Sequence, residues 1–288
     1  MRWRALFPEK TKNSANPLYL TGVLCAAFVF NFALPGPVGE ALSAWMAKEK
    51  SKIEFSEALA SLGLSRIIGL GSACAIAGFV YWVAPFDIPE KWGAALKITA
   101  GLLGIAALGL AIIAIFPNHP KSWLQRLAQF SFLQGNITQK IFDTIDQLFQ
   151  ALIETTGRGL RAYIESTFWA LSGHALVASG IFLAIQAMGL TAAWSAVMFT
   201  YAASIAGSVA MFMLPGSSVG WDVLFGTTLS ITANLPPAVA VAVTAIIRIQ
   251  QMIVALIGVL VVWIYAKELL FRALKRLNVD APDSQKPS

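Results

Sequence analysis

A stretch of 101 consecutive residues, from Ser166 to Ala266, contains only two formal charges, Asp222 and Arg248. In the whole chain 12% of residues are charged and 57% are apolar, whereas a soluble domain carries about 25% charged residues. Too few charged side chains are present to cover a globule of 288 residues. The sequence therefore predicts a polytopic membrane protein, and it excludes a soluble fold, a nucleic-acid module and a secreted disulfide scaffold.

Apolar runs of membrane-spanning length define the helices that we expect. A helix needs about 20 apolar residues to cross a hydrocarbon core of ~30 Å. Six runs meet this condition, at 17–34, 66–84, 93–116, 163–188, 193–214 and 248–266. Basic residues mark the cytoplasmic side, and they precede the first run, occupy 117–165 and follow Ala266. We therefore expect a multi-pass protein of the cytoplasmic (inner) cell membrane with both termini in the cytoplasm.

These orientations are consistent only if two further segments, 35–65 and 215–247, each cross the membrane once. Both are interrupted by Pro, Gly or charged residues, so we expect broken or re-entrant helices there. The expected fold is all-α, a membrane bundle of about eight crossings. Its expected parts are a first transmembrane repeat (1–116), a cytoplasmic linker (117–162) with an amphipathic helix at 137–153, a second, inverted repeat (163–277) and a disordered cytoplasmic tail (278–288).

The two interrupted segments resemble each other. The first begins Leu34-Pro35-Gly36-Pro37-Val38-Gly39-Glu40, and the second begins Leu214-Pro215-Gly216-Ser217-Ser218-Val219-Gly220-Trp221-Asp222. Arg66 follows Glu40 by 26 residues, and Arg248 follows Asp222 by the same number. The flanking spans run outward in the first half and inward in the second, so the repeat is inverted. Inverted repeats with paired discontinuous helices are typical of membrane carriers, which bind their substrate near the bilayer midplane.

The residues of the two motifs are suited to binding a phosphate. Each Pro-Gly pair breaks one helix and starts another, and the restarted helix directs its N-terminal amides and positive dipole end at the break. An arginine adds a permanent charge and a planar fork that can bind two phosphate oxygens. The candidate substrate-binding residues are Arg66, Arg248, Glu40, Asp222, Pro35, Gly36, Gly39, Pro215, Gly216 and Gly220.

Structural roles for the same charges remain open at this point. Each arginine could snorkel to the interface from a helix end, or pair with its neighbouring acid. Glu40 and Asp222 could neutralise the arginines in the empty protein, or complement a helix dipole. His174 is alone on an apolar helix, so we expect it to form an interhelical hydrogen bond rather than to bind a metal. We expect no catalytic residue, no metal site and no cofactor.

The chain resembles the lysylphosphatidylglycerol synthase transmembrane family of flippase-like integral membrane proteins. The early motif Pro-x-x-x-Gly-Glu followed by an arginine carries the resemblance, here Pro35, Gly39, Glu40 and Arg66. So does a late Pro-Gly-Gly-x-Gly-type motif, although Ser217 and Asp222 stand where a second Gly and a Glu are usual. The resemblance implies an eight-helix inner-membrane bundle with two re-entrant segments, linked in some members to the movement of a modified phospholipid or carrier lipid between leaflets.

We therefore expect a lipid flippase or lipid transporter that moves a phosphate-bearing lipid between the leaflets of the bacterial cytoplasmic membrane. Its expected partners are a phospholipid or carrier lipid and the bilayer, with no nucleic acid, and a homo-oligomer is compatible with the sequence. One alternative is a non-transporting membrane partner of a lipid-synthesis enzyme. Another is an enzyme acting on a lipid phosphate with Asp222 or Glu40 as base. The symmetric repeat and the lack of a nucleophile motif favour the carrier over an enzyme.

Overall fold

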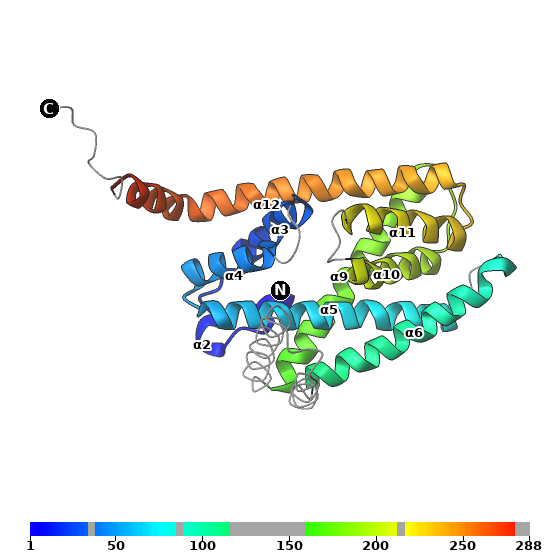
Figure 1. Ribbon diagram of the computed structural model, residues 1–288, viewed down its shortest axis with the longest axis horizontal. Helices are drawn as coiled ribbons and strands as arrows, with labels where there is room; N and C mark the ends of the chain where they lie inside the picture. The colour runs from blue at the N-terminus through cyan, green and yellow to red at the C-terminus, as the bar shows by residue number, and fades with distance from the viewer. Residues whose placement is uncertain (34–37, 85–88, 116–158, 212–216, 280–288) are drawn as a thin grey trace, which may run out of the picture.

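The structure is a computed structural model that describes residues 1–33, 38–84, 89–115, 159–211 and 217–279 (Figure 1). Every regular element in these residues is an α-helix, as the composition predicts. Several predicted features lie outside the described residues. They are the amphipathic helix at 137–153 and the motif residues Pro35, Gly36, Pro215 and Gly216.

The first half of the chain contains a short helix between two longer ones. Helix α3 (Pro17–Ala33) is followed by α4 (Val38–Ser51), α5 (Phe55–Val83) and α6 (Glu90–Ile115), and each contacts the next. The turn between α4 and α5 is tight, because Lys52 adopts a left-handed conformation with φ of 56°. This turn brings the start of α4 beside the interior of α5.

The second half also contains a short helix between two longer ones, here preceded by a further long helix. Helix α9 (Leu160–Ala187) precedes α10 (Trp194–Met211), the short α11 (Ser217–Thr232) and the long α12 (Pro237–Val279), again with contacts between successive helices. Asn234 is left-handed, with φ of 51°, and ends the α11 segment. Pro237 then occupies the first position of α12, where its missing N–H costs no helical hydrogen bond.

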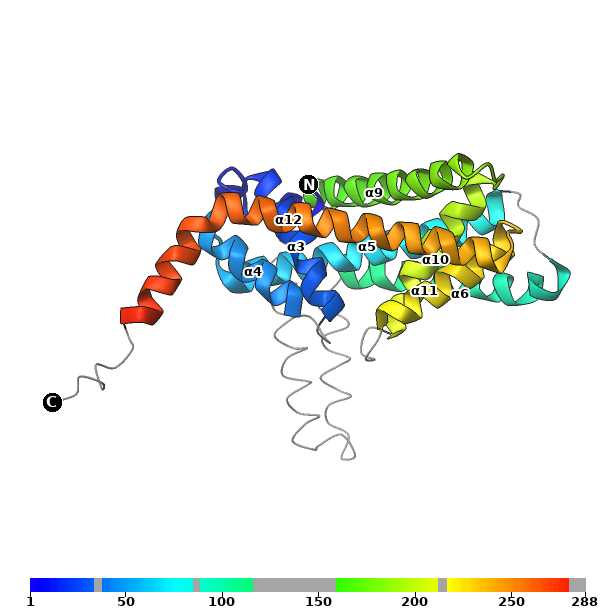
Figure 2. The same cartoon turned by 90° about the horizontal axis from the view of Figure 1, so that it is seen from above.

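The two halves pack on each other through reciprocal helices. Helix α12 lies against α3, and α5 lies against α10 (Figures 1 and 2). The α3–α12 contact is close, because a Cβ atom at Gly258 would lie 2.6 Å from the backbone nitrogen of Ala26. Small residues allow such close helix approach in membranes. The long helix of each half, α5 or α12, thus packs against the helix that precedes the short helix of the other half, α10 or α3.

Four of the described helices contain segments long and apolar enough to cross a membrane, at Phe55–Val83, Glu90–Ile112, Leu160–Ala187 and Pro237–Tyr265. The protein is therefore a multi-pass membrane protein, as predicted. Two predicted boundaries are wrong, since α5 begins at Phe55 rather than 66 and α12 begins at Pro237 rather than 248. The prediction required runs without charged residues, so it placed the start of each of these two spans at the arginine. A helix continues through one arginine when a carboxylate neutralises it.

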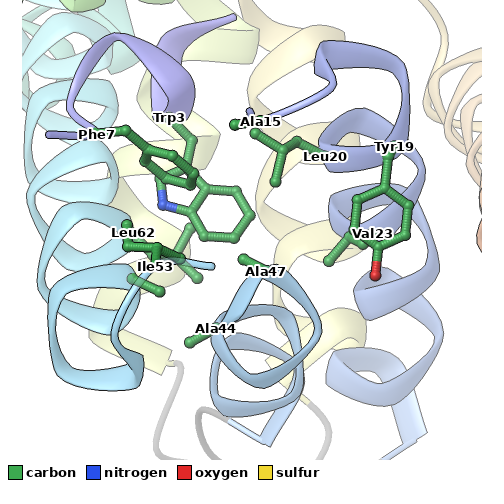
Figure 3. Close-up of a cluster of buried hydrophobic side chains, with 11 residues drawn as sticks. Trp3, Phe7, Ala15, Tyr19, Leu20, Val23, Ala44, Ala47, Ile53 and Leu62 are labelled. Atoms are coloured by element: carbon green, nitrogen blue, oxygen red, sulfur yellow. The ribbon is translucent and has the colours of Figure 1, made fainter. Parts of the chain in front are cut away.

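The N-terminal segment packs into the bundle. It contains α1 (Arg2–Ala5), which contacts α5 and α9, and α2 (Glu9–Lys12). Trp3 is 2% exposed, its ring meets that of Phe7 edge-on at 5.3 Å, and its indole N–H donates to Ser61 Oγ at 3.0 Å. Figure 3 shows Trp3 and Phe7 among side chains of α3, α4 and α5. The sequence analysis treated this segment only as a basic flank that sets orientation.

Candidate functional site

The first motif acid is paired with the first motif arginine. Glu40 lies in the first turn of α4, and Arg66 lies in the interior of α5. Arg66 Nη2 is 3.1 Å from Glu40 Oε1, and the Glu40 side chain is 16% exposed against 50% for Arg66. Gly39 is buried directly before Glu40, and its carbonyl accepts a hydrogen bond from Ser43 Oγ at 2.8 Å. The ion pair joins the restarted helix to the long helix that follows.

The second motif acid and arginine form an equivalent pair between α11 and α12. Arg248 Nε donates to Asp222 Oδ1 at 2.6 Å, and the two side chains are 19% and 32% exposed. Arg248 Nη1 also donates to Gln251 Oε1 at 2.8 Å, and the guanidinium carbon lies 4.7 Å from the centre of the Trp221 ring. Gly220 is half-buried in the same turn of α11. In both halves the acid lies in ion-pair contact with its arginine, which is one of the arrangements that the sequence analysis left open.

Arg2 is a third guanidinium near the first pair, and the sequence analysis missed it. Its Nε donates to Ser65 Oγ at 2.9 Å, and a Cβ atom at Gly69 would overlap its Nη1. Burial, with the positive charge of Arg66, lowers the pKa of Arg2 to about 10. Among the described residues no carboxylate forms an ion pair with Arg2. No local sequence pattern marks this placement, because it depends on tertiary contacts of the N-terminal segment with α5.

His174 of α9 contacts the same turn of α5 as Arg2. Its Nε2 is 3.0 Å from the Gly69 carbonyl oxygen, and its ring centre is 5.9 Å from that of Tyr201. The predicted interhelical hydrogen bond, here between α9 and α5, is confirmed. No group of three or more His, Cys, Asp or Glu in the described part of the chain could hold a metal ion.

A cavity of about 1270 Å³ lies between α5, α6 and α9. Its wall on α5 starts at Ile67 and Ile68, in the turn that carries Arg66, and continues through Gly71 to Trp82. Tyr163 of α9 lines the same cavity and packs with Ile68 and with Leu6 of the N-terminal segment. Because the walls are mostly aliphatic and aromatic, the cavity is chemically suited to a hydrocarbon chain.

These features define a class of protein, a multi-pass helical membrane protein with two acid–arginine pairs between its helices and an apolar cavity between α5, α6 and α9. A family model described as the lysylphosphatidylglycerol synthase TM region matches residues 1–275. The chain therefore belongs to that family, as the motifs suggested, and the family is a membrane domain related to lipid handling. The chain matches neither a curated protein nor a solved structure.

Proposed function

We propose that this protein is a lipid translocase that moves a phosphate-bearing lipid between the leaflets of the bacterial cytoplasmic membrane without altering it covalently. The observation that carries the proposal is the pair of acid–arginine contacts at equal chain separation, Glu40 with Arg66 and Asp222 with Arg248. Ionisable groups in membrane helices mark substrate pathways far more often than lipid-facing positions.

The reciprocal packing of α12 on α3 and of α5 on α10 supports an inverted repeat. Each proposed repeat places a helix, a break, a short helix and a long helix in the same order. Such a repeat builds two equivalent gates around one site, and exchange between the two gates provides alternating access. An enzyme needs one asymmetric site instead, and a partner subunit needs no gate.

In this proposal the arginines bind the phosphate and the acids neutralise them in the empty protein. Arg66 has a half-exposed side chain, so part of its fork is available to a ligand. Pro35 and Pro215, which have no N–H, would interrupt the helices, and Gly36, Gly39, Gly216 and Gly220 would supply backbone amides at the breaks. The bound partner is a phospholipid or carrier lipid, and the protein acts alone, as a homo-oligomer or beside a lipid-synthesis enzyme.

Purified protein in vesicles tests this function directly. Fluorescent phosphatidylglycerol in the inner leaflet becomes reducible by external dithionite only after it moves outward. We expect faster exposure than in protein-free vesicles, with the lipid recovered unchanged by mass spectrometry. An unchanged rate would favour the non-transporting partner, and a chemically altered lipid would favour an enzyme. Arg161→Gln, an exposed change on α9, is the matched control and should move lipid at the wild-type rate.

A further inference from the structure

The second arginine is held by two uncharged neighbours in addition to its acid. Arg248 Nε donates to Asp222 Oδ1 at 2.6 Å, and Nη1 donates to Gln251 Oε1 at 2.8 Å. The guanidinium carbon also lies 4.7 Å from the centre of the Trp221 ring. Because these three contacts restrain two of its nitrogens and its central carbon, they fix both the position and the plane of the guanidinium.

The Trp221 ring is itself held in the core of the second half. It is 9% exposed, and it stacks on the Phe225 ring with the ring centres 4.9 Å apart and the planes at 12°. The buried cluster to which it belongs also contains Val243 and Ile247 of α12. A ring packed in this way offers the guanidinium a rigid surface.

The first half has glycine at both corresponding positions. Gly39 takes the place of Trp221 immediately before the acid, and Gly69 takes the place of Gln251 three residues after the arginine. Glycine has no side chain that could hold a guanidinium. The arginine side chain of the first half is 50% exposed, and that of the second half is 19% exposed. The two acid–arginine pairs therefore share their spacing but differ in how firmly the arginine is held.

We propose that Gln251 and Trp221 are positioning residues that hold the Arg248 guanidinium in a fixed orientation without neutralising its charge. This inference rests on the proposed function, in which a lipid phosphate replaces Asp222 as the counter-charge, and it adds two residues to that site. An amide oxygen and an aromatic face attract a cation but carry no net charge. They therefore keep Arg248 in place while the phosphate replaces the carboxylate.

A restrained arginine binds a ligand more tightly than a mobile one, because less side-chain freedom is lost on binding. The holding contacts are made before the lipid arrives, so they lower this cost at Arg248. Loss of Gln251 or of the Trp221 ring should therefore weaken the apparent affinity for lipid by about threefold to tenfold. The maximal rate of lipid movement should change less, because the charge of the arginine is retained.

NMR of the full-length protein in detergent, with isotopically labelled arginine side chains, measures how firmly Arg248 is held. Its signals are identified by their loss in Arg248→Gln. Gln251→Met keeps a side chain of similar length but removes the acceptor, so the Arg248 Nη1 group should rotate at least about tenfold faster than in wild type. Gln250→Met, at the neighbouring exposed residue of α12, is the matched control and should rotate as wild type does.

Lipid movement gives a second readout, measured with fluorescent phosphatidylglycerol in phosphatidylcholine vesicles over a range of labelled-lipid fractions. Gln251→Met should raise the half-saturating fraction about threefold to tenfold and change the maximal rate by less than about twofold. Gln251→Glu keeps an acceptor for Nη1 but adds a charge that neutralises the arginine. It should therefore keep slow rotation and still raise the half-saturating fraction about threefold or more. Gln250→Met should match wild type.

The aromatic contact is tested separately. Trp221→Phe keeps an aromatic ring beside Phe225 and should retain most of the apparent affinity, whereas Trp221→Leu should lose about threefold. If Trp221→Leu fails to fold, the two Gln251 variants still decide the outcome. The positioning role is overturned if Gln251→Met leaves Nη1 rotation unchanged, if its effect falls on the maximal rate alone, or if Gln251→Glu moves lipid with the wild-type half-saturating fraction, as a purely structural role predicts.

Failure of the positioning role and failure of the translocase function give different results. If wild-type protein moves phosphatidylglycerol and both Gln251 variants match it, the function stands and the positioning role is wrong. If wild-type protein moves no lipid although Gln251→Met releases Nη1 of Arg248, the translocase is wrong and the holding of Arg248 by Gln251 stands.

Discussion

Asp222 Oδ1 lies 2.6 Å from Arg248 Nε, and Glu40 Oε1 lies 3.1 Å from Arg66 Nη2 at the same chain separation. In each half the acid is on the short helix after the break, and the arginine is inside the long helix that follows. A charged residue in a membrane helix costs about 3 kcal/mol or more when it is alone. Each carboxylate offsets this cost while staying close to the break.

The Asp222–Arg248 pair should show strong energetic coupling. Arg248→Gln leaves the Asp222 carboxylate without its partner, so we expect it to destabilise the protein more than the double change Asp222→Asn with Arg248→Gln. A double-mutant cycle measured by unfolding in detergent should give a coupling energy of about 1 to 3 kcal/mol. Independent, additive effects would mean that the contact is incidental.

Burial of the Arg2 guanidinium should cost stability. Replacing a buried charge with an apolar side chain of similar length is often neutral or stabilising, so Arg2→Met should unfold at an equal or higher temperature than wild type in detergent. If Arg2→Met were strongly destabilised, the hydrogen bond of Arg2 to Ser65 would outweigh the cost of burying its charge.

The pH dependence of lipid binding distinguishes the arginines from His174 and from the Met1 amino group. Even Arg2, whose pKa burial lowers to about 10, stays protonated below that pH and loses its charge only as the pH rises through it. We therefore expect the dissociation constant for phosphatidylglycerol to be the same at pH 6 and pH 8. An ordinary histidine titrates at about 6.5, and burial with the charge of Arg2 lowers the pKa of the Met1 amino group below its ordinary value. Binding that tightens from pH 8 to pH 6 would therefore indicate His174 or the Met1 amino group, rather than an arginine, as the cation.

The contact between the two halves should be intolerant of added volume at Gly258. A Cβ atom there would lie 2.5 Å from Cys25 Cβ and 2.6 Å from the Ala26 backbone nitrogen, and backbone cannot move aside cheaply. Gly258→Ala should therefore destabilise the protein by about 1 to 3 kcal/mol. Gly173→Ala on α9, where nothing lies within 4 Å, is the matched control and should change the unfolding temperature little. Equal effects would contradict the close α3–α12 packing.

Much of this architecture follows from patterns of charge and helix breakers. The apolar runs identified the long helices. The equal spacing of Glu40–Arg66 and Asp222–Arg248 indicated that the two motifs are equivalent, and opposite charges within a membrane tend to pair with each other. The helix starts at Phe55 and Pro237 were mispredicted, since a paired arginine does not end a helix.

The placement of Arg2 could not be predicted in the same way. Basic residues near an N-terminus normally follow the positive-inside rule and remain in water. The position of Arg2 depends on burial of Trp3 and Phe7 against α3, α4 and α5 and on the space left by Gly69. These are tertiary contacts between distant parts of the chain, and no local pattern encodes them.

The central proposal is that the arginines of both halves bind the phosphate of a lipid as the lipid crosses the membrane. Its most direct test is the rate of outward movement of fluorescent phosphatidylglycerol in vesicles containing wild type, Arg66→Gln, Arg248→Gln or the Arg161→Gln control at equal, folded amounts. We predict that each motif variant moves lipid at least about tenfold more slowly than wild type and Arg161→Gln. Wild-type rates for both motif variants would contradict the account.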